Sequence, residues 1–254
     1  MRGERAQRHG EAGGEGSQPE EDAPHAPTII EWLRARAPSV VDRFVDVDGI
    51  RLCRYAADIV AIIVMPAVPT RRFTRVEYER LAELDFFRPG ERLELIDGVL
   101  VVREPQDTPH ATGVRLVVRA LRAVFGAGWI VDSQLPVALD DYSEPEPDVA
   151  VVAGEPRDYR EAHPARPVLI VEVAESRLAF DRRDKASLYA RAGIADYWVV
   201  NLVERVVEVH QEPVADATAP YGFGYRSITR LATPASVTPL AAPSASIPVA
   251  DLLP

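Results

Sequence analysis

Hydrophobic residues recur at helical spacing in three parts of the chain. These parts are residues 74–87, 110–126 and 181–193. The first begins at Thr74 with Glu77 three residues later, which is the pattern of a capping box. Its apolar stripe consists of Val76, Leu81 and Leu84. In the third, Asp181 stands at the expected N-cap and Gly193 at the expected end.

Alternating or continuous apolar runs indicate strands between and after these helices. Two β-rich arms around Asp97-Gly98 predict a hairpin over residues 91–104. Further strands are expected within residues 129–139, 144–154, 167–176, 196–201, 205–211 and 225–232. The run at 167–176 is almost wholly apolar, which is typical of a central strand. Valine is abundant, and the pattern predicts an α/β or α+β fold.

The N-terminal quarter of the chain has a different character. Residues 1–27 are rich in Gly, Glu, Pro and Arg without periodicity, so we expect disorder there. Residues 28–37 suit a short helix and residues 59–64 a strand. We interpret residues 1–64 as a disordered or dispensable extension, and residues 65–254 as the domain.

Composition and the lengths of apolar runs indicate where in the cell the protein is located. The apolar run at residues 59–68 is far shorter than the ~20 residues of a membrane helix, so no membrane span is expected. The N-terminus lacks the apolar region of a secretory signal. The single cysteine, Cys53, permits no internal disulfide. These features predict a cytoplasmic protein.

Charged residues that lie inside apolar runs are the candidate site residues. Glu172 lies within the strand-like VLIVEVA, where a carboxylate must be paired or coordinated. Asp148 follows an EPEP run whose prolines fix the approach of the chain. Glu94 lies in the first hairpin arm on the inward side. Lys185, the only lysine beside 28 arginines, shares the apolar helix face with Tyr189.

Three inward carboxylates and one ammonium leave a charge of −2, which a divalent cation would neutralise. Oxygen ligands suit Mg²⁺ or Mn²⁺, and no Cys/His cluster has the spacing of a zinc site. A structural ion pair between Glu172 and Lys185 is the simpler alternative. Two side chains are left open: His110 either contacts a phosphate or a metal-bound water or only begins a helix, and Tyr189 either bonds within the site or is a core aromatic.

The order of these residues resembles a known superfamily. Pro147-Asp148, then Glu172 in an apolar strand, then a lysine is similar to the PD-(D/E)XK nucleases. The chain also resembles the Uma2 family (DUF820) over about residues 70–254. The segments that carry this resemblance are PGERLELIDGVLV, YSEPEPDVAVV and VLIVEVAESRLAFDRRDKASLYARAGIADYWVVN. A strict (D/E)XK motif would place the lysine at Ala174, so the resemblance implies that it has moved to the following helix.

The resemblance implies a restriction-endonuclease-like α/β core, with a mixed central sheet flanked by helices, an extra N-terminal hairpin and C-terminal strands. It also implies metal-dependent hydrolysis of DNA. Asp148, Glu172 and the carbonyl of Val173 would bind Mg²⁺, Glu94 would hold a water or second ion, and Lys185 would position the nucleophile.

Binding of DNA needs positive charge, and the net charge of the chain is −10. Local arginines would have to supply it: Arg115, Arg119, Arg122, Arg182 and Arg183. We expect a homodimer. The alternative function is a catalytically silent nuclease-fold module that binds nucleic acid or a protein partner. A two-carboxylate glycosidase is disfavoured by the lysine.

Overall fold

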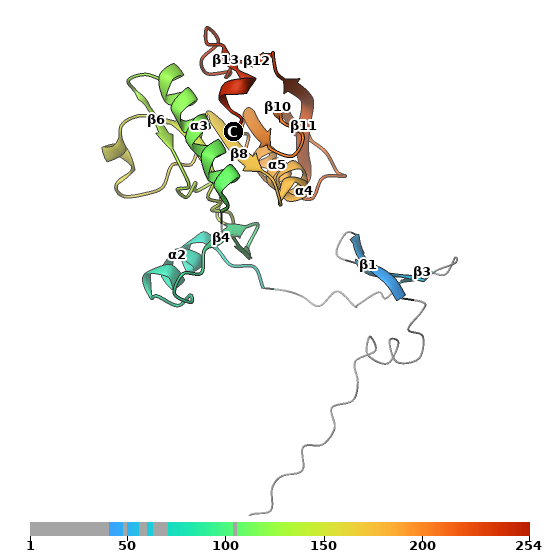
Figure 1. Ribbon diagram of the computed structural model, residues 1–254. Coiled ribbons are helices and arrows are strands. Elements are labelled where there is room, and N and C mark those ends of the chain that lie inside the picture. Colours follow the sequence, from blue (N-terminus) through green and yellow to red (C-terminus); the bar gives the residue numbers. More distant parts are fainter. Residues whose placement is uncertain (1–40, 48–49, 56–59, 63–70, 104–105) are drawn as a thin grey trace, which may run out of the picture. The chain divides into compact units, whose positions relative to one another are not determined.

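The computed structural model describes residues 41–47, 50–55, 60–62, 71–103 and 106–254 (Figure 1). The chain divides into two compact units, Met1–Pro69 and Thr70–Pro254. In the first unit, β1 (Val41–Val47), β2 (Ile50–Tyr55) and β3 (Val60–Ile62) pair as an antiparallel meander. The disorder expected at residues 1–27 and the helix expected at 28–37 lie outside the described residues. That residues 1–64 are dispensable stays a prediction.

A six-stranded sheet forms the centre of the second unit. Its order is β11 (Phe223–Ala232), β10 (Val206–Ala215), β9 (Asp196–Asn201), β8 (Leu169–Ala174), β7 (Val149–Ala153) and β6 (Trp129–Asp132). Only the β8–β9 pair is parallel in this sheet, and its other neighbours are antiparallel. The predicted α/β fold with a mixed central sheet is thus confirmed. Strand β8 lies inside the sheet and is buried along its length, as its apolar run predicted.

Helices lie on both sides of this sheet (Figure 1). Helix α3 (Thr108–Val124) buries Val114, Val117 and Leu121 in a core cluster with Val171 and Val173 of β8. Helix α5 (Ala186–Arg191) buries Tyr189 in a second cluster with Ile170 and Ala174. Since successive strand residues point to opposite faces, Glu172 shares the α5 face with Ile170 and Ala174.

The C-terminal segment also packs against this core. Strands β12 (Ser236–Val237) and β13 (Ile247–Pro248) pair, and a 3₁₀ turn, η3 (Val249–Asp251), follows. Leu252 near the C-terminus is buried in the same cluster as Val171. A second 3₁₀ turn, η1 (Pro156–Tyr159), lies between β7 and β8.

Helix α2 (Arg75–Glu83) confirms one sequence prediction and corrects another. The Thr74–Glu77 capping box forms as predicted. The helix stops before residue 87 because Asp85 adopts a positive φ of 50°. The apolar stripe does not face a core, since Val76 and Leu84 are 68% and 60% exposed.

The predicted hairpin is present as β4 (Leu93–Ile96) and β5 (Val99–Val102). Its turn residues Asp97 and Gly98 both have positive φ, 47° and 81°, as a type I′ turn requires. All four residues of β4 are buried, so Glu94 points inward as predicted.

The third predicted helix is continuous but irregular. It consists of α4 (Leu178–Phe180), a π-helical turn η2 (Asp181–Lys185) and α5. The prediction that Asp181 caps this helix is wrong: helical structure already begins at Leu178, so the residue lies inside the helix. Gly193 does follow its end, with a φ of 75°.

Candidate active site

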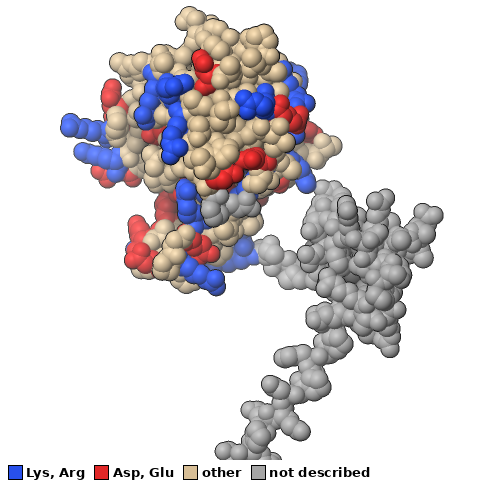
Figure 2. Space-filling model, in the orientation of Figure 1, with Lys and Arg blue, Asp and Glu red and all other residues tan. Residues whose placement is uncertain are grey.

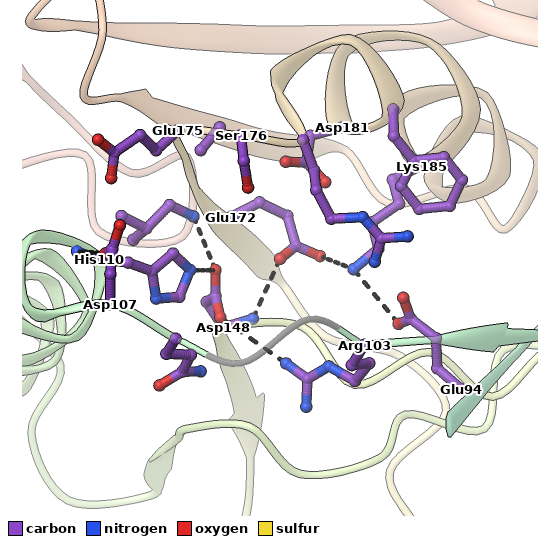
Figure 3. Close-up of a pocket in the computed structure, with 15 residues that line it drawn as sticks. Glu94, Arg103, Asp107, His110, Asp148, Glu172, Glu175, Ser176, Asp181 and Lys185 are labelled. Carbon is purple, nitrogen blue, oxygen red and sulfur yellow. Dashed lines mark hydrogen bonds and ion pairs between the residues drawn. The ribbon is translucent and has the colours of Figure 1, made fainter. Parts of the chain in front are cut away.

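One pocket of about 90 Å³ gathers the candidate residues (Figure 3). Its walls come from the hairpin, the start of α3, the end of β8 and the helical segment that follows. The lining residues are Glu94, Arg103, Gln106, Asp107, His110, Asp148, Glu172, Val173, Ala174, Glu175, Ser176, Arg177, Phe180, Asp181 and Lys185. The fold therefore brings Glu94, Asp148, Glu172 and Lys185 together from four separate segments, as the sequence predicted.

Asp148 lies directly before β7 and is 4% exposed. Its Oδ2 accepts the Val173 amide at 2.9 Å and lies 3.0 Å from Nε2 of His110. Its Oδ1 accepts a hydrogen bond from Gln134 at 3.3 Å. Burial by itself would raise the pKa of Asp148, but the contact with His110 and the Val173 amide outweigh burial and lower it. Asp148 is therefore ionised at neutral pH.

Glu172 also has three hydrogen-bond partners among the described residues. Oε1 accepts hydrogen bonds from Nζ of Lys185 at 2.9 Å and from the Tyr189 hydroxyl at 2.7 Å. Oε2 accepts the Asp148 amide at 3.2 Å. Burial raises the pKa of Glu172, and the Lys185 charge opposes this change. The sequence left two roles open for Tyr189, and the residue has both: it packs in the core and donates a hydrogen bond to Glu172.

Lys185 lies between two carboxylates. Its Nζ is 2.9 Å from Oε1 of Glu172 and 3.3 Å from Oε2 of Glu94. Burial would lower the pKa of Lys185, but the charges of Glu172 and Glu94 raise it well above its usual value. The ammonium is therefore protonated at neutral pH, so in this arrangement it can orient and stabilise groups but not act as a base.

The carbonyl of Val173 lies on the same side of β8 as Asp148. In a strand, the N–H and C=O of one residue point to the same side. The Val173 amide donates to Asp148, whereas the Ala174 carbonyl accepts from Leu202 on the opposite side. Ladder pairing between β7 and β8 ends at Val149 and Val171, so no strand β7 partner competes for that carbonyl.

His110 belongs to the site and also to the first turn of α3. Its amide donates to the N-cap Asp107 and its ring contacts Asp148. Burial would lower the pKa of His110, but its hydrogen bond to Asp148 and nearby carboxylates raise it. Nδ1 is buried and has no hydrogen-bond partner among the described residues.

Residues of the pocket fit a divalent cation by chemical type. Carboxylate oxygens predominate, and the buried Oε1 of Glu94 has no hydrogen-bond partner within the described part of the chain. Across the same residues, however, no three acidic, histidine or cysteine side chains are already arranged around one metal position. The Lys185 ammonium lies between Glu94 and Glu172 instead, so a bound ion requires these side chains to reorient.

The predicted DNA-contacting arginines are not gathered at the pocket. Arg115, Arg119 and Arg122 are exposed on α3, and Figure 2 shows basic side chains over this helix. They lie on the helix face opposite the buried Val114 and Val117. Arg182 is held by Glu204 and Glu208, so most of its charge is compensated within the protein. Arg183 is exposed on the helical segment.

Arg103 and Asp181 are two of the pocket residues that the predicted site did not include. Arg103 forms an ion pair with Glu146 and lies 3.8 Å from Asp148. Its position directly after the β5 strand, on the hairpin that carries Glu94, was an available signal. Asp181 was assigned to a cap, because a π-helical turn leaves no trace in the residue pattern.

The chain is similar to known proteins in sequence and in fold. A family model named Uma2, described as "Putative restriction endonuclease", matches residues 75–250. No curated protein matches the chain significantly. Among solved structures, the chain is similar to one described as a "putative nuclease belonging to DUF820 from Anabaena variabilis ATCC 29413".

That structural similarity has a TM-score of 0.54 at 17% sequence identity. It covers 71% of this chain and 97% of the other, and at this identity it shows the shared fold alone. Among the described residues, no helix is long and apolar enough to cross a membrane. The Uma2 match extends over more than half of the 254 residues, so the chain belongs to the Uma2 family.

Proposed function

We propose that this chain is a metal-dependent endonuclease that hydrolyses phosphodiester bonds in DNA. The observation that carries the proposal is the convergence of Asp148, Glu172, Lys185 and Glu94 in one pocket. The family description and the nuclease-like fold support the same activity.

Asp148, Glu172 and the Val173 carbonyl are the residues that would hold Mg²⁺ or Mn²⁺. Such an ion, when bound, supplies Lewis-acid activation of water and neutralises charge on the phosphate. His110 orients the Asp148 carboxylate through its 3.0 Å contact, and the Val173 amide fixes it from the other side. The protein thereby keeps one carboxylate ionised and aimed at the ligand position.

Lys185 supplies a fixed positive charge beside these ligands. A protonated ammonium 2.9 Å from Glu172 can donate to an attacking water or to a phosphate oxygen and stabilise the charge of the transition state. Glu94 holds the ammonium from the opposite side and can also accept from water through its second oxygen. The lysine ammonium is compact and has three rotatable donors, whereas the bulkier guanidinium of arginine has its donors in a fixed planar fork.

The arginines of α3 are the part of the DNA contact that lies beyond the pocket. Arg115, Arg119 and Arg122 form one exposed stripe that would bind backbone phosphates without sequence preference. Arg183 would add to this contact, and Arg182 contributes little because of its acidic partners. We expect the nuclease to be a homodimer, which light scattering of the purified chain tests.

The alternative is a silent nuclease-fold module that binds nucleic acid or a protein. The observation favouring it is that Lys185 already compensates Glu94 and Glu172, and that no three candidate ligands of the described residues are preassembled. The two functions differ in whether the buried acids bind a metal ion and whether DNA is cut.

A plasmid-cleavage assay separates them. Supercoiled and single-stranded DNA are incubated with Mg²⁺, Mn²⁺ or EDTA and with wild type, Asp148→Asn, Glu172→Gln or Lys185→Met. Glu161→Gln is the matched control, because Glu161 is an exposed acid outside the pocket. We expect metal-dependent cleavage that is lost in the three pocket variants and kept in the control. Folded wild-type protein that cuts nothing under any condition would favour the silent module.

A further inference from the structure

Asp181 is a buried acid that the mechanism above does not use. It begins the π-helical turn Asp181–Lys185, lines the pocket and is 6% exposed. In Figure 3 it extends from the helical segment on the side of Glu172. Turns of this kind occur frequently at functional sites.

The side chain of Asp181 is not needed by the helix that carries it. Its main-chain carbonyl accepts a hydrogen bond from the Tyr197 hydroxyl at 3.0 Å, which holds the backbone in place. Helical structure begins upstream at Leu178, so the carboxylate does not cap an N-terminus. The helix therefore does not use this carboxylate, and the residue lines the pocket.

Each of the other buried acids in the pocket has hydrogen-bond donors. Asp148 accepts from the Val173 amide, Glu172 from Lys185 and Tyr189, and Glu94 from the Glu146 amide. Within the described residues, no hydrogen bond or ion pair reaches the carboxylate of Asp181.

A buried, unpaired carboxylate is costly. Because Asp181 lines the pocket and forms no ion pair among the described residues, a cation from outside the chain would stabilise it there.

The buried charges of the pocket point to the kind of ligand. Four buried carboxylates, those of Glu94, Asp148, Glu172 and Asp181, line the pocket together with one buried ammonium, that of Lys185. When these acids are ionised, the buried groups carry an excess of negative charge, which favours a cation as the ligand.

We propose that Asp181 is a further ligand of the divalent cation, either directly or through one water. This inference rests on the proposed metal-dependent function and adds to the pair Asp148 and Glu172 a carboxylate from the helix that carries Lys185. Because Asp181 and Lys185 belong to one turn, the bound cation would be fixed relative to the ammonium that orients the nucleophile.

The test is Mn²⁺ binding to the full chain, measured by titration calorimetry and by the rise in melting temperature on adding Mn²⁺. The variants are Asp181→Asn, Asp181→Ala and, as a ligand-loss reference, Asp148→Asn. Asp184→Asn is the matched control, since Asp184 lies in the same turn but does not line the pocket.

We expect both Asp181 variants to bind Mn²⁺ at least about tenfold more weakly than wild type. Their melting temperatures without metal should be equal to or above that of wild type, because a buried unpaired acid is removed. Asp184→Asn should bind as wild type does. A purely structural role would instead lower the metal-free melting temperature and leave the affinity unchanged.

Wild-type affinity in both Asp181 variants, together with lost binding in Asp148→Asn, would overturn this inference and leave the proposed function standing. Absence of Mn²⁺ binding by wild type, or unchanged binding in Asp148→Asn, would instead overturn the proposed metal site and this inference with it.

Discussion

His210 should make the protein lose stability in mild acid. Its ring lies in β10, is 2% exposed and packs 5.3 Å from the ring of Tyr197 and 5.7 Å from that of Tyr225. Neither ring nitrogen has a hydrogen-bond partner among the described residues. Burial lowers the pKa of His210 to about 4, Glu208 opposes this change, and Arg182 adds to it.

The sign and size of the effect follow from these pKa values. Well above pH 6.5 the imidazole is neutral in both folded and unfolded chains, so it adds no pH dependence there. Between 6.5 and about 4 the unfolded chain binds a proton that the folded chain does not, so stability falls as the pH falls. At ~1.4 kcal/mol per pKa unit, the full loss is about 3.4 kcal/mol, of which about 2 kcal/mol is lost by pH 5.

The assay is urea unfolding at pH 7.5 and pH 5.0 for wild type and His210→Phe. Phenylalanine keeps an aromatic ring between the two tyrosines and removes the titrating group. We expect the free energy of unfolding of wild type to fall by about 2 kcal/mol more than that of the variant between the two pH values. Groups with raised pKa values, such as Asp181 and Glu144, are present in both proteins and cancel in the comparison. Equal pH dependence in the two proteins would refute the reasoning.

Three further substitutions test other parts of the structure. Lys185→Met should lower the free energy of unfolding by about 3–5 kcal/mol because it leaves two buried carboxylates uncompensated, and adding Glu94→Gln should restore part of it in urea unfolding. Thr74→Ala removes the capping box and should cost about 1 kcal/mol. Because α2 buries no residue, amide exchange should speed up within α2 alone. Arg191→Met breaks the ion pair that joins α5 to the turn of the hairpin at Asp97. It should lower stability by about 1–2 kcal/mol and speed amide exchange in β4 and β5.

The sequence was most informative where structure is determined by neighbouring residues. Asp97-Gly98 specified its turn, the Thr74 box specified a helix start, and the apolar run around Glu172 specified an inner strand. The four site residues could be identified because each charge stands within a segment whose face is set by its apolar neighbours. Their meeting in one pocket followed from family resemblance, since spacing along the chain carries no distance.

Interactions between distant residues account for what the sequence did not predict. Arg182 was expected to face DNA, but Glu204 and Glu208 from the region of β9 and β10 bind it. The apolar stripe on α2 indicated the helix correctly, but Val76 and Leu84 are exposed in the part of the chain that the structure describes. Asp181 was assigned to a cap because the residue pattern does not reveal that helical structure begins at Leu178.

The π-helical turn changes which side chains of the helical segment can face the pocket. In a regular helix, the positions of the residues that pack in the core also fix the directions of all other side chains. One wider turn shifts the phase between the two parts of the segment. Tyr189 and Leu188 keep their places in the interior, while Asp181 and Lys185 face the pocket. Deleting one residue between Asp181 and Lys185 should therefore disrupt the pocket far more than the sheet, so that the pocket can be lost while the fold is kept.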